Sequence, residues 1–176
     1  MKKSTQFKSA LAAFLVGAVI CCPAAANEEI VPSSKDAPSL VLQSQGQASS
    51  VVVETARSFL GTPYVWGGVT ASGFDCSGYV QEVMRLNGYS VPRLADIQFE
   101  KSHKVTYENL KAGDMVFFST YLPGASHCGF YLGGGEFIHA SSAGKKVIIS
   151  QMRTGYYRQR FVGGGRPEGW NGDRSS

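Results

Sequence analysis

The sequence has few cysteines and no long hydrophobic run, and both shortages narrow the class of protein. Only four of its 176 residues are cysteine, which is too few for the disulfide frameworks that stabilise many small secreted domains. The apolar run Ala10–Ile20 is shorter than the roughly 20 residues that a membrane-spanning helix needs. Internal repeats and coiled-coil heptads are also absent. With 43% hydrophobic residues, the chain can bury one ordinary core, and we expect a single folded domain.

The N-terminus has the three-part pattern of a secretory signal. Three lysines come before the apolar run, and Ala24–Ala26 supplies small residues for a signal peptidase. We interpret residues 1–26 as a cleaved signal peptide, and we therefore expect export to the periplasm or cell envelope. Cys21 and Cys22 raise a lipoprotein alternative, but neither follows the small Gly or Ala that a lipid-attachment site normally shows. No transmembrane segment is expected in the mature chain.

The rest of the chain divides by composition into an arm, a domain and a tail. Residues 27–50 are rich in Ser, Gln, Pro and Ala, as in a polar linker or arm. We place the folded domain at residues 51–166 and a polar C-terminal tail at residues 167–176. Loss of residues 1–26 removes three of the 17 basic residues and none of the 13 acidic ones, so the mature chain is nearly neutral.

The remaining basic residues concentrate between Phe137 and Pro167, a segment without Asp or Glu. Such a segment can attract an anionic polymer such as cell-wall material, and the alternative is an ordinary solvated face. A nucleic-acid partner is not expected, and we expect a monomer. The basic residues are Lys145, Lys146, Arg153, Arg158, Arg160 and Arg166.

The apolar spacing predicts helices first and strands later, which is typical of an α+β fold. Residues 51–60 have helical spacing, and a second helix is predicted from Cys76 to the stop signal Asn87–Gly88. Short apolar runs bounded by glycine then predict an antiparallel sheet of about five strands, against which the helices pack. These runs are Met115–Thr120, His127–Leu132, Glu136–Ser141, Val147–Met152 and Phe161–Gly165.

Cys76 and two of the three histidines, His127 and His139, are the residue types that a thiol enzyme needs. A cysteine becomes a strong nucleophile as a thiolate, which helix N-termini and neighbouring imidazoles favour. Cys76 lies in the first turn of the second predicted helix, where unpaired N–H groups and the helix dipole favour a negative sulfur. Asp75 is a candidate N-cap of this helix. Taken singly, each residue is more often structural, so the hypothesis depends on their conjunction.

Three glycines, Gly133–Gly135, separate the two predicted strands that carry the histidines. With all three in the loop, Leu132 faces Glu136. His139 then faces Gly129, and the two histidines lie diagonally on one face of the ribbon. A two-residue loop would shift the pairing by one and place the histidines on opposite faces.

Cys128 directly follows His127, and successive strand residues point to opposite faces. If His127 faces the site, Cys128 faces the core, where a free cysteine behaves as a small hydrophobe. We therefore do not expect a disulfide between Cys76 and Cys128. The third histidine, His103, lies in a polar stretch and is assigned to the surface.

Six motifs follow one another along the predicted domain: Gly61–Gly68, Phe74–Gln81, Val91–Arg93, Leu110–Phe118, Ser126–His127 and Phe137–Ser141. In this order they resemble the successive signatures of the NlpC/p60 family of cell-wall cysteine peptidases. Within that family the chain looks most like the Spr-type murein endopeptidases of Gram-negative envelopes. The resemblance covers about residues 51–166.

The resemblance implies a papain-like α+β fold and hydrolysis of peptide bonds in peptidoglycan stems or cross-links. By match of motif, Cys76 would be the nucleophile, His127 the general base and His139 the residue that orients His127. The hydroxyl of Tyr64 and the backbone N–H of Cys76 would form the oxyanion site. No metal or cofactor is implied. Contacts with the peptide substrate are expected from Asp75, Ser77, Trp66 and Arg93.

Two departures from the family pattern and three alternatives stay open. Leu94-Ala95 stands where the family often has a small hydroxyl residue, and Cys128 replaces the usual branched aliphatic residue. A cysteine and two histidines could supply three zinc ligands, although no close-set pair such as Cys-x-x-Cys accompanies them. An amidase or acyltransferase could use the same triad on another substrate. A non-catalytic wall-binding module could share the fold, although the triad positions are all filled.

Overall fold

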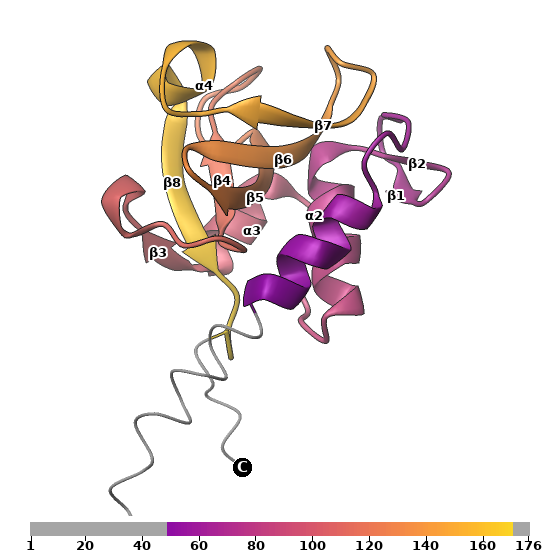
Figure 1. The fold of residues 1–176 in the computed structure, drawn as a ribbon, viewed down its shortest axis with the longest axis horizontal. Helices are drawn as coiled ribbons and strands as arrows, with labels where there is room; N and C mark the ends of the chain where they lie inside the picture. The colour runs from indigo at the N-terminus through magenta and orange to yellow at the C-terminus, as the bar shows by residue number, and fades with distance from the viewer. Residues whose placement is uncertain (1–48, 171–176) are drawn as a thin grey trace, which may run out of the picture. The chain divides into compact units, whose positions relative to one another are not determined.

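A six-stranded antiparallel sheet with helices packed on it dominates the part of the chain that the computed structural model describes, residues 49–170 (Figure 1). This architecture confirms the predicted α+β fold class. The signal assigned to residues 1–26, nearly all of the arm and residues 171–176 lie outside the described residues. In spatial order the strands are β3 (His103–Val105), β8 (Phe161–Arg166), β4 (Met115–Phe118), β5 (His127–Gly133), β6 (Glu136–Ser141) and β7 (Lys146–Gln151).

The helices come mainly before the sheet in the sequence. Residues 49–58 are helical and lie beside α2, as Figure 1 shows. A two-residue ladder of β1 and β2 connects them to α2. None of the helices in the described region is long and apolar enough to cross a membrane. The elements outside the large sheet are β1 (Val69–Thr70), β2 (Gly73–Phe74), α2 (Cys76–Leu86), α3 (Ala95–Lys101), the 3-10 turn η1 (Tyr107–Asn109) and α4 (Gly155–Gln159).

Helix α2 places the first residue of the candidate triad. Asp75 caps its N-terminus by accepting a hydrogen bond from the backbone N–H of Gly78, as the sequence predicted. The helix ends at Leu86 with Asn87 as its C-cap, and Gly88 follows with a φ of 80°. Its apolar stripe faces β5 and β6, and these side chains are fully buried: Tyr79, Val80, Val83 and Met84.

The two faces of the sheet carry separate apolar clusters, because successive strand residues point in opposite directions. On β5, Cys128 and Phe130 point toward α2 and join its core cluster. On the other face, Phe118 and Phe137 pack with Tyr157 of α4. The sheet thus separates the core beneath α2 from an aromatic cluster beneath α4.

The five predicted strands are confirmed within one or two residues at their ends, and the sheet gains a sixth strand that the sequence did not reveal. In β3 only Val105 is buried, while His103 and Lys104 are exposed, so the segment lacks a strong apolar pattern. Pairing of β3 with β8 supplies its stability instead. The exposure of His103 agrees with its assignment to the surface.

Described residues on both sides of the predicted domain, residues 51–166, also contact it. Ser49 is helical, and its hydroxyl donates a hydrogen bond to the carbonyl of Ala112. Trp170, which the sequence placed in the polar tail, is buried, and its ring lies 5.3 Å from that of Tyr89. The aromatic contact packs the residues after β8 against the segment that follows α2.

Arg166 differs from the other residues of the predicted basic segment because it forms a buried ion pair. Its Nε lies 2.6 Å from Oδ1 of Asp114, whose side chain is fully buried. Arg166 therefore ties the end of β8 to the start of β4 and does not add to a free basic surface. Lys145, Lys146 and Arg158 are exposed.

Candidate active site

The three residues of the predicted triad come from α2, β5 and β6, which pack against one another. Cys76 begins α2, His127 begins β5, and His139 lies in β6. All three side chains are buried, with exposed fractions of 5%, 8% and 0%, respectively. His127 and His139 follow Cys76 by 51 and 63 positions in the sequence, and the packing of the three elements brings these residues together.

The β5–β6 hairpin has the predicted register around the histidines, but its turn is shorter than predicted. Gly133 pairs with Glu136, so the loop is the two-residue turn Gly134–Gly135 and the predicted Leu132–Glu136 pair is wrong. The register then shifts by one residue between Tyr131 and Gly133. A β-bulge adds one residue to one strand, and it here cancels the effect of the shorter loop.

The shift restores both histidines to one face of the hairpin. Phe130 pairs with Ile138, and Gly129 therefore lies opposite His139. His127 Nε2 and His139 Nδ1 lie 2.7 Å apart, and their rings meet edge to face. The predicted proximity of the two imidazoles is thus observed.

A serine that the sequence analysis missed completes this chain of hydrogen bonds. Ser150 of β7 has its Oγ 3.0 Å from Nε2 of His139. Both ring nitrogens of His139 therefore have partners, one on each side. The strand was predicted, but Ser150 could be placed beside His139 only once the β6–β7 register was known.

Burial fixes the charge state of His139. Removal from water, and then the positive charge of nearby His127, lower the pKa of His139 well below its usual range. The ring is stacked on Phe137, with centroids 4.4 Å apart, and it also meets Tyr157. His139 is therefore a neutral hydrogen-bonding partner of His127 in an aromatic enclosure.

The thiol of Cys76 is held in its reactive form. A hydrogen bond from Cys128 and interactions with His127 lower the pKa of Cys76 from 9.0 to about 5, although burial opposes this change. At neutral pH the sulfur is thus a thiolate. Its position in the first turn of α2 adds the unpaired N–H groups and dipole of a helix N-terminus.

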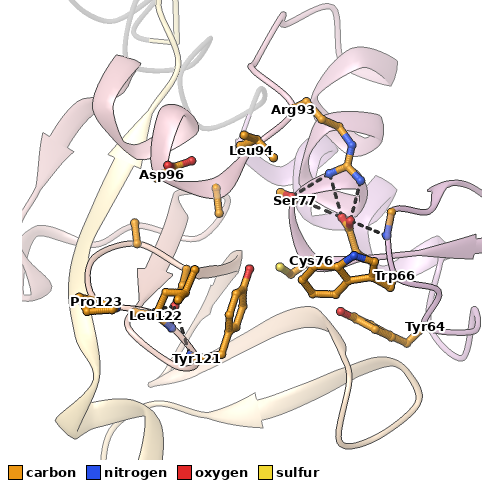
Figure 2. A pocket seen from close by; sticks show the side chains of 15 residues that line it. Tyr64, Trp66, Cys76, Ser77, Arg93, Leu94, Asp96, Tyr121, Leu122 and Pro123 are labelled. Atoms are coloured by element: carbon orange, nitrogen blue, oxygen red, sulfur yellow. Dashed lines mark hydrogen bonds and ion pairs between the residues drawn. The ribbon is translucent and has the colours of Figure 1, made fainter.

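A groove gives access to the sulfur between two loops that come from different parts of the chain (Figure 2). Tyr64 and Trp66 line one side of it, and Tyr121 and Leu122 line the other. The rings of Trp66 and Tyr121 approach edge to face, with centroids 6.0 Å apart. Trp66 is 74% exposed, so a large apolar surface beside the thiol remains available to a ligand. The loop of Tyr121 and Leu122 carried no recognisable motif.

Three of the predicted substrate contacts bind one another in this structure. The carboxylate of Asp75 accepts two hydrogen bonds from Arg93, at 3.0 and 2.5 Å, and Arg93 also donates to Ser77 Oγ. Asp75 further accepts from the backbone N–H groups of Gly67 and Gly78. Its oxygens are therefore occupied, whereas Arg93 uses only three of the five N–H donors of a guanidinium in these bonds. Arg93 and Ser77 still line the groove.

Tyr64 is the side chain predicted to donate to the oxyanion. It lines the groove with Cys76, and burial, followed by the negative charges of Cys76 and Asp75, raises the pKa of Tyr64 to about 12. Its hydroxyl therefore stays protonated and can donate a hydrogen bond.

The described region contains no group of three or more His, Cys, Asp or Glu side chains that could hold a metal ion. Part of the reason is that ring nitrogens of the two histidines are already hydrogen-bonded. Nε2 of His127 is directed at His139, and each imidazole nitrogen of His139 already has a hydrogen-bond partner.

Comparison with known proteins identifies the family to which the chain is similar. The sequence profile of the NlpC/P60 family matches residues 61–166. Over 138 residues the chain is 38% identical to a γ-D-glutamyl-L-lysine dipeptidyl-peptidase of Bacillus subtilis, with 77% of this chain and 45% of the relative covered. Over 117 residues it is 43% identical to the probable peptidoglycan endopeptidase LytE of the same organism, with 66% and 34% covered. The chain thus spans less than half the length of these relatives.

Proteins of known structure share the fold of this chain. The peptidoglycan hydrolase RipB of Mycobacterium tuberculosis superposes with a TM-score of 0.62 at 28% identity, with 77% of this chain and 72% of that chain covered. These matches do not single out Spr-type proteins.

Proposed function

Because the chain belongs to the NlpC/P60 family, we propose that it is a cysteine peptidase that hydrolyses peptide bonds in peptidoglycan. The observation that carries the proposal is the placement of Cys76, which begins α2 beside β5 and lines the groove, near a His127 imidazole that is held by the imidazole of His139. The lowered pKa of Cys76 agrees with this placement. A binding module would have no need of a thiolate at the end of a groove. The names of the relatives support the substrate, since they include a probable peptidoglycan endopeptidase.

The triad acts by acyl transfer in this proposal. The Cys76 thiolate attacks the scissile carbonyl carbon, and the carbonyl oxygen becomes a tetrahedral oxyanion. The Tyr64 hydroxyl and the backbone N–H of Cys76 donate hydrogen bonds to that oxygen. His127 protonates the leaving amine, which gives a thioester, and then removes a proton from the water that hydrolyses it. His139 orients His127 throughout.

The groove supplies contacts for the stem peptide. Trp66 offers an exposed apolar face, and the unused N–H donors of Arg93 suit a substrate carboxylate. Ser77 Oγ lies beside them. We propose that Asp75 acts indirectly, because its oxygens already hold Arg93 and the backbone of the Gly-rich loop.

Several finer features remain proposals. Residues 1–26 would direct export to the periplasm or cell envelope, residues 27–50 would form an arm, and the chain would act as a monomer without a cofactor. A Spr-type role in a Gram-negative envelope is also a proposal. The peptide bond after D-glutamate is the first candidate for cleavage, because one relative is named for the γ-D-glutamyl-L-lysine bond.

The test compares the protein with its Cys76→Ala variant on defined muropeptides, with the products identified by mass. We expect the parent to release fragments that map to one bond, and the variant to fall to background while its circular dichroism stays unchanged. Inactivation by iodoacetamide and survival in a strong chelator would set aside a zinc mechanism. Intact muropeptides with a Cys76 that still reacts with iodoacetamide would contradict the peptidase and favour an amidase or acyltransferase with another substrate.

A further inference from the structure

The β4–β5 loop, residues 119–126, has no part in the proposed mechanism, although it forms one side of the groove. Tyr121 and Leu122, in the middle of this loop, are 56% and 61% exposed. Loops that only connect strands are normally polar and carry turn-forming residues. Two large apolar side chains that point into solvent beside the thiol therefore indicate a function for this loop beyond the connection of two strands.

The apolar side chains of the β4–β5 loop belong to a cluster. In the described region, the four large hydrophobic side chains with the greatest exposure are Trp66 (74%), Leu122 (61%), Leu94 (57%) and Tyr121 (56%). All four line the groove that contains Cys76 (Figure 2). Exposed apolar side chains that are scattered singly are normal, whereas a cluster of them marks a binding surface. Because this cluster is continuous with the groove, a ligand that reaches the thiol also meets it.

The hydroxyl of Ser126 holds the β4–β5 loop together. Its Oγ donates a hydrogen bond to the carbonyl oxygen of Leu122, at 3.0 Å, and accepts one from the backbone N–H of Thr120, at 2.9 Å. The backbone N–H groups of Tyr121 and Leu122 lie farther from the same oxygen, at 3.4 Å each. Ser126 is only 6% exposed, so these contacts are shielded from water. One side chain thus fixes the backbone that carries both apolar side chains.

The ends and the tip of the β4–β5 loop are also anchored. Phe118 pairs with His127 across its base, and the backbone N–H of Ser126 donates to the carbonyl oxygen of Phe118. At the tip, the ring of Tyr121 meets the ring of Trp66 edge to face, with centroids 6.0 Å apart. The loop therefore has a defined position beside the groove, as a binding surface requires.

We propose that the β4–β5 loop, held in shape by Ser126, is an apolar wall that binds the aliphatic part of the peptide substrate next to the cleaved bond. The inference rests on the proposed role of Cys76 as nucleophile. Tyr121 and Leu122 are the specificity-determining residues of this wall, and Ser126 is a positioning residue that acts through them. Burial of an aliphatic chain stabilises the bound substrate and the transition state alike. The wall therefore acts on KM and leaves kcat nearly unchanged.

Two alkylating reagents with the same reactive group test the wall without peptidoglycan. Iodoacetamide and N-hexyliodoacetamide react with Cys76 by the same step, but only the second carries an aliphatic chain. The ratio of their rates, with Cys76→Ala as the background, measures the contribution of that chain. The parent should react roughly 5-fold faster with the N-hexyl reagent, because apolar surface is buried in the groove. The double variant Tyr121→Ala/Leu122→Ala should bring the ratio close to that of a small free thiol.

The matched control is Leu86→Ala, because Leu86 is also an exposed leucine, at 50%, but does not line the groove. Its ratio should equal that of the parent. A ratio that stays at the parent value in Tyr121→Ala/Leu122→Ala would overturn the proposal.

The role of Ser126 is tested in two backgrounds. Ser126→Ala should lower the ratio in the parent, whereas Ser126→Thr keeps the hydroxyl and should remain closer to the parent. In the Tyr121→Ala/Leu122→Ala background, Ser126→Ala should have no further effect, because a positioning residue acts only through the side chains that it places. An equal effect of Ser126→Ala in both backgrounds would refute this role.

Steady-state kinetics on a muropeptide give the second readout. Tyr121→Ala/Leu122→Ala and Ser126→Ala should raise KM roughly 5-fold, with kcat within about 2-fold of the parent. A fall in kcat at constant KM in Ser126→Ala would mean that this residue acts on the adjacent His127 and not on the wall. Thermal melting identifies a variant that does not fold, and the two exposed positions carry the test if Ser126→Ala is such a variant.

The two readouts separate this inference from the proposed function. A parent that prefers the N-hexyl reagent through the wall but leaves every muropeptide intact would refute the peptidase and keep the wall. A parent that cleaves muropeptides, with KM and the alkylation ratio unchanged in Tyr121→Ala/Leu122→Ala, would refute the wall alone.

Discussion

At the scale of single residues, the hydrogen-bonded chain of His127, His139 and Ser150 bears on which ring nitrogen of His127 can exchange a proton with Cys76. His139 is neutral, so one of its ring nitrogens donates and the other accepts. If Nε2 donates to Ser150 Oγ, Nδ1 must accept from Nε2 of His127. The remaining nitrogen of His127, Nδ1, is then the one that can exchange a proton with the thiol. In this arrangement Ser150 supports the His139 tautomer by accepting from Nε2, two side chains away from the sulfur.

Ser150→Ala tests this chain. The loss of one neutral hydrogen bond, about 1 kcal/mol, should lower kcat by roughly 5-fold, with little change in KM because Ser150 does not line the groove. Steady-state kinetics on a muropeptide would measure both constants. His139→Ala is the reference and should lose much more, since His127 then has no acceptor. Equal kcat values for Ser150→Ala and the parent would show that the tautomer is fixed without the serine.

At the scale of elements, the sequence predicted what depends on local pattern and missed what depends on neighbours. Helix α2, its cap at Asp75 and the main strands followed from apolar spacing and glycine boundaries. Strand β3 was missed because pairing with β8, rather than its own residues, makes it a strand. Helix α3 was missed for a similar reason, since its buried residues are only Ala95 and Gln98.

The candidate site followed the same division. Cys76, His127 and His139 could be predicted because their types and contexts are chemically specific. The hydrogen-bonding role of Ser150 could not, because an ordinary serine acquires such a role only through the register of distant elements. The sequence predicted that both histidines lie on one face of the hairpin, but it assumed a three-residue loop. The observed turn has two residues, and the bulge before Gly133 compensates for the difference.

The close approach of β5 and β6 depends on Gly129. A Cβ at this position would lie 2.4 Å from the carbonyl oxygen of Ile138 and 2.8 Å from Cβ of His139. Gly129→Ala should therefore push β6 away, with a loss of about 1–3 kcal/mol in the free energy of unfolding. It should also lower kcat/KM, because His139 moves from His127. Denaturant unfolding and kinetics would measure the two effects.

Gly134→Ala is the matched control for this hairpin. Its Cβ would meet nothing within 4 Å, although its φ of +62° adds strain of about 1–2 kcal/mol. The control should lose stability while its kcat/KM stays near that of the parent. Similar kinetics in both variants would mean that the histidine pair tolerates movement of the strand.

At the scale of the whole molecule, segments distant in sequence converge on the two residues Asp75 and Cys76. Asp75 joins the Gly-rich loop through the N–H of Gly67, α2 through that of Gly78, and the chain before α3 through Arg93. Cys76 lies where α2 packs on β5, and it shares one core cluster with Cys128. Folding therefore assembles the surroundings of the thiolate, and the charge of the thiolate must in turn affect folding.

This linkage predicts a specific pH dependence of stability. Cys76 has a pKa of about 5 in the folded chain and an ordinary value of 9.0 when its partners are absent. Between these limits the unfolded chain binds more protons, so the free energy of unfolding rises with pH. The contribution is fully present above about pH 9 and is lost as the pH falls through about 5. Above its own ordinary value of 9.0, the raised pKa of Cys128 acts with the opposite sign.

Cys76→Ala removes the ionisable thiol and therefore isolates its contribution to the pH dependence of the unfolding free energy. The difference in unfolding free energy between the parent and Cys76→Ala should grow in favour of the parent from about pH 5 to about pH 9. Urea titrations at several pH values within that window would measure it. Parallel curves for the parent and Cys76→Ala would mean that the sulfur carries no charge in the folded protein, and the thiolate mechanism would fail with it.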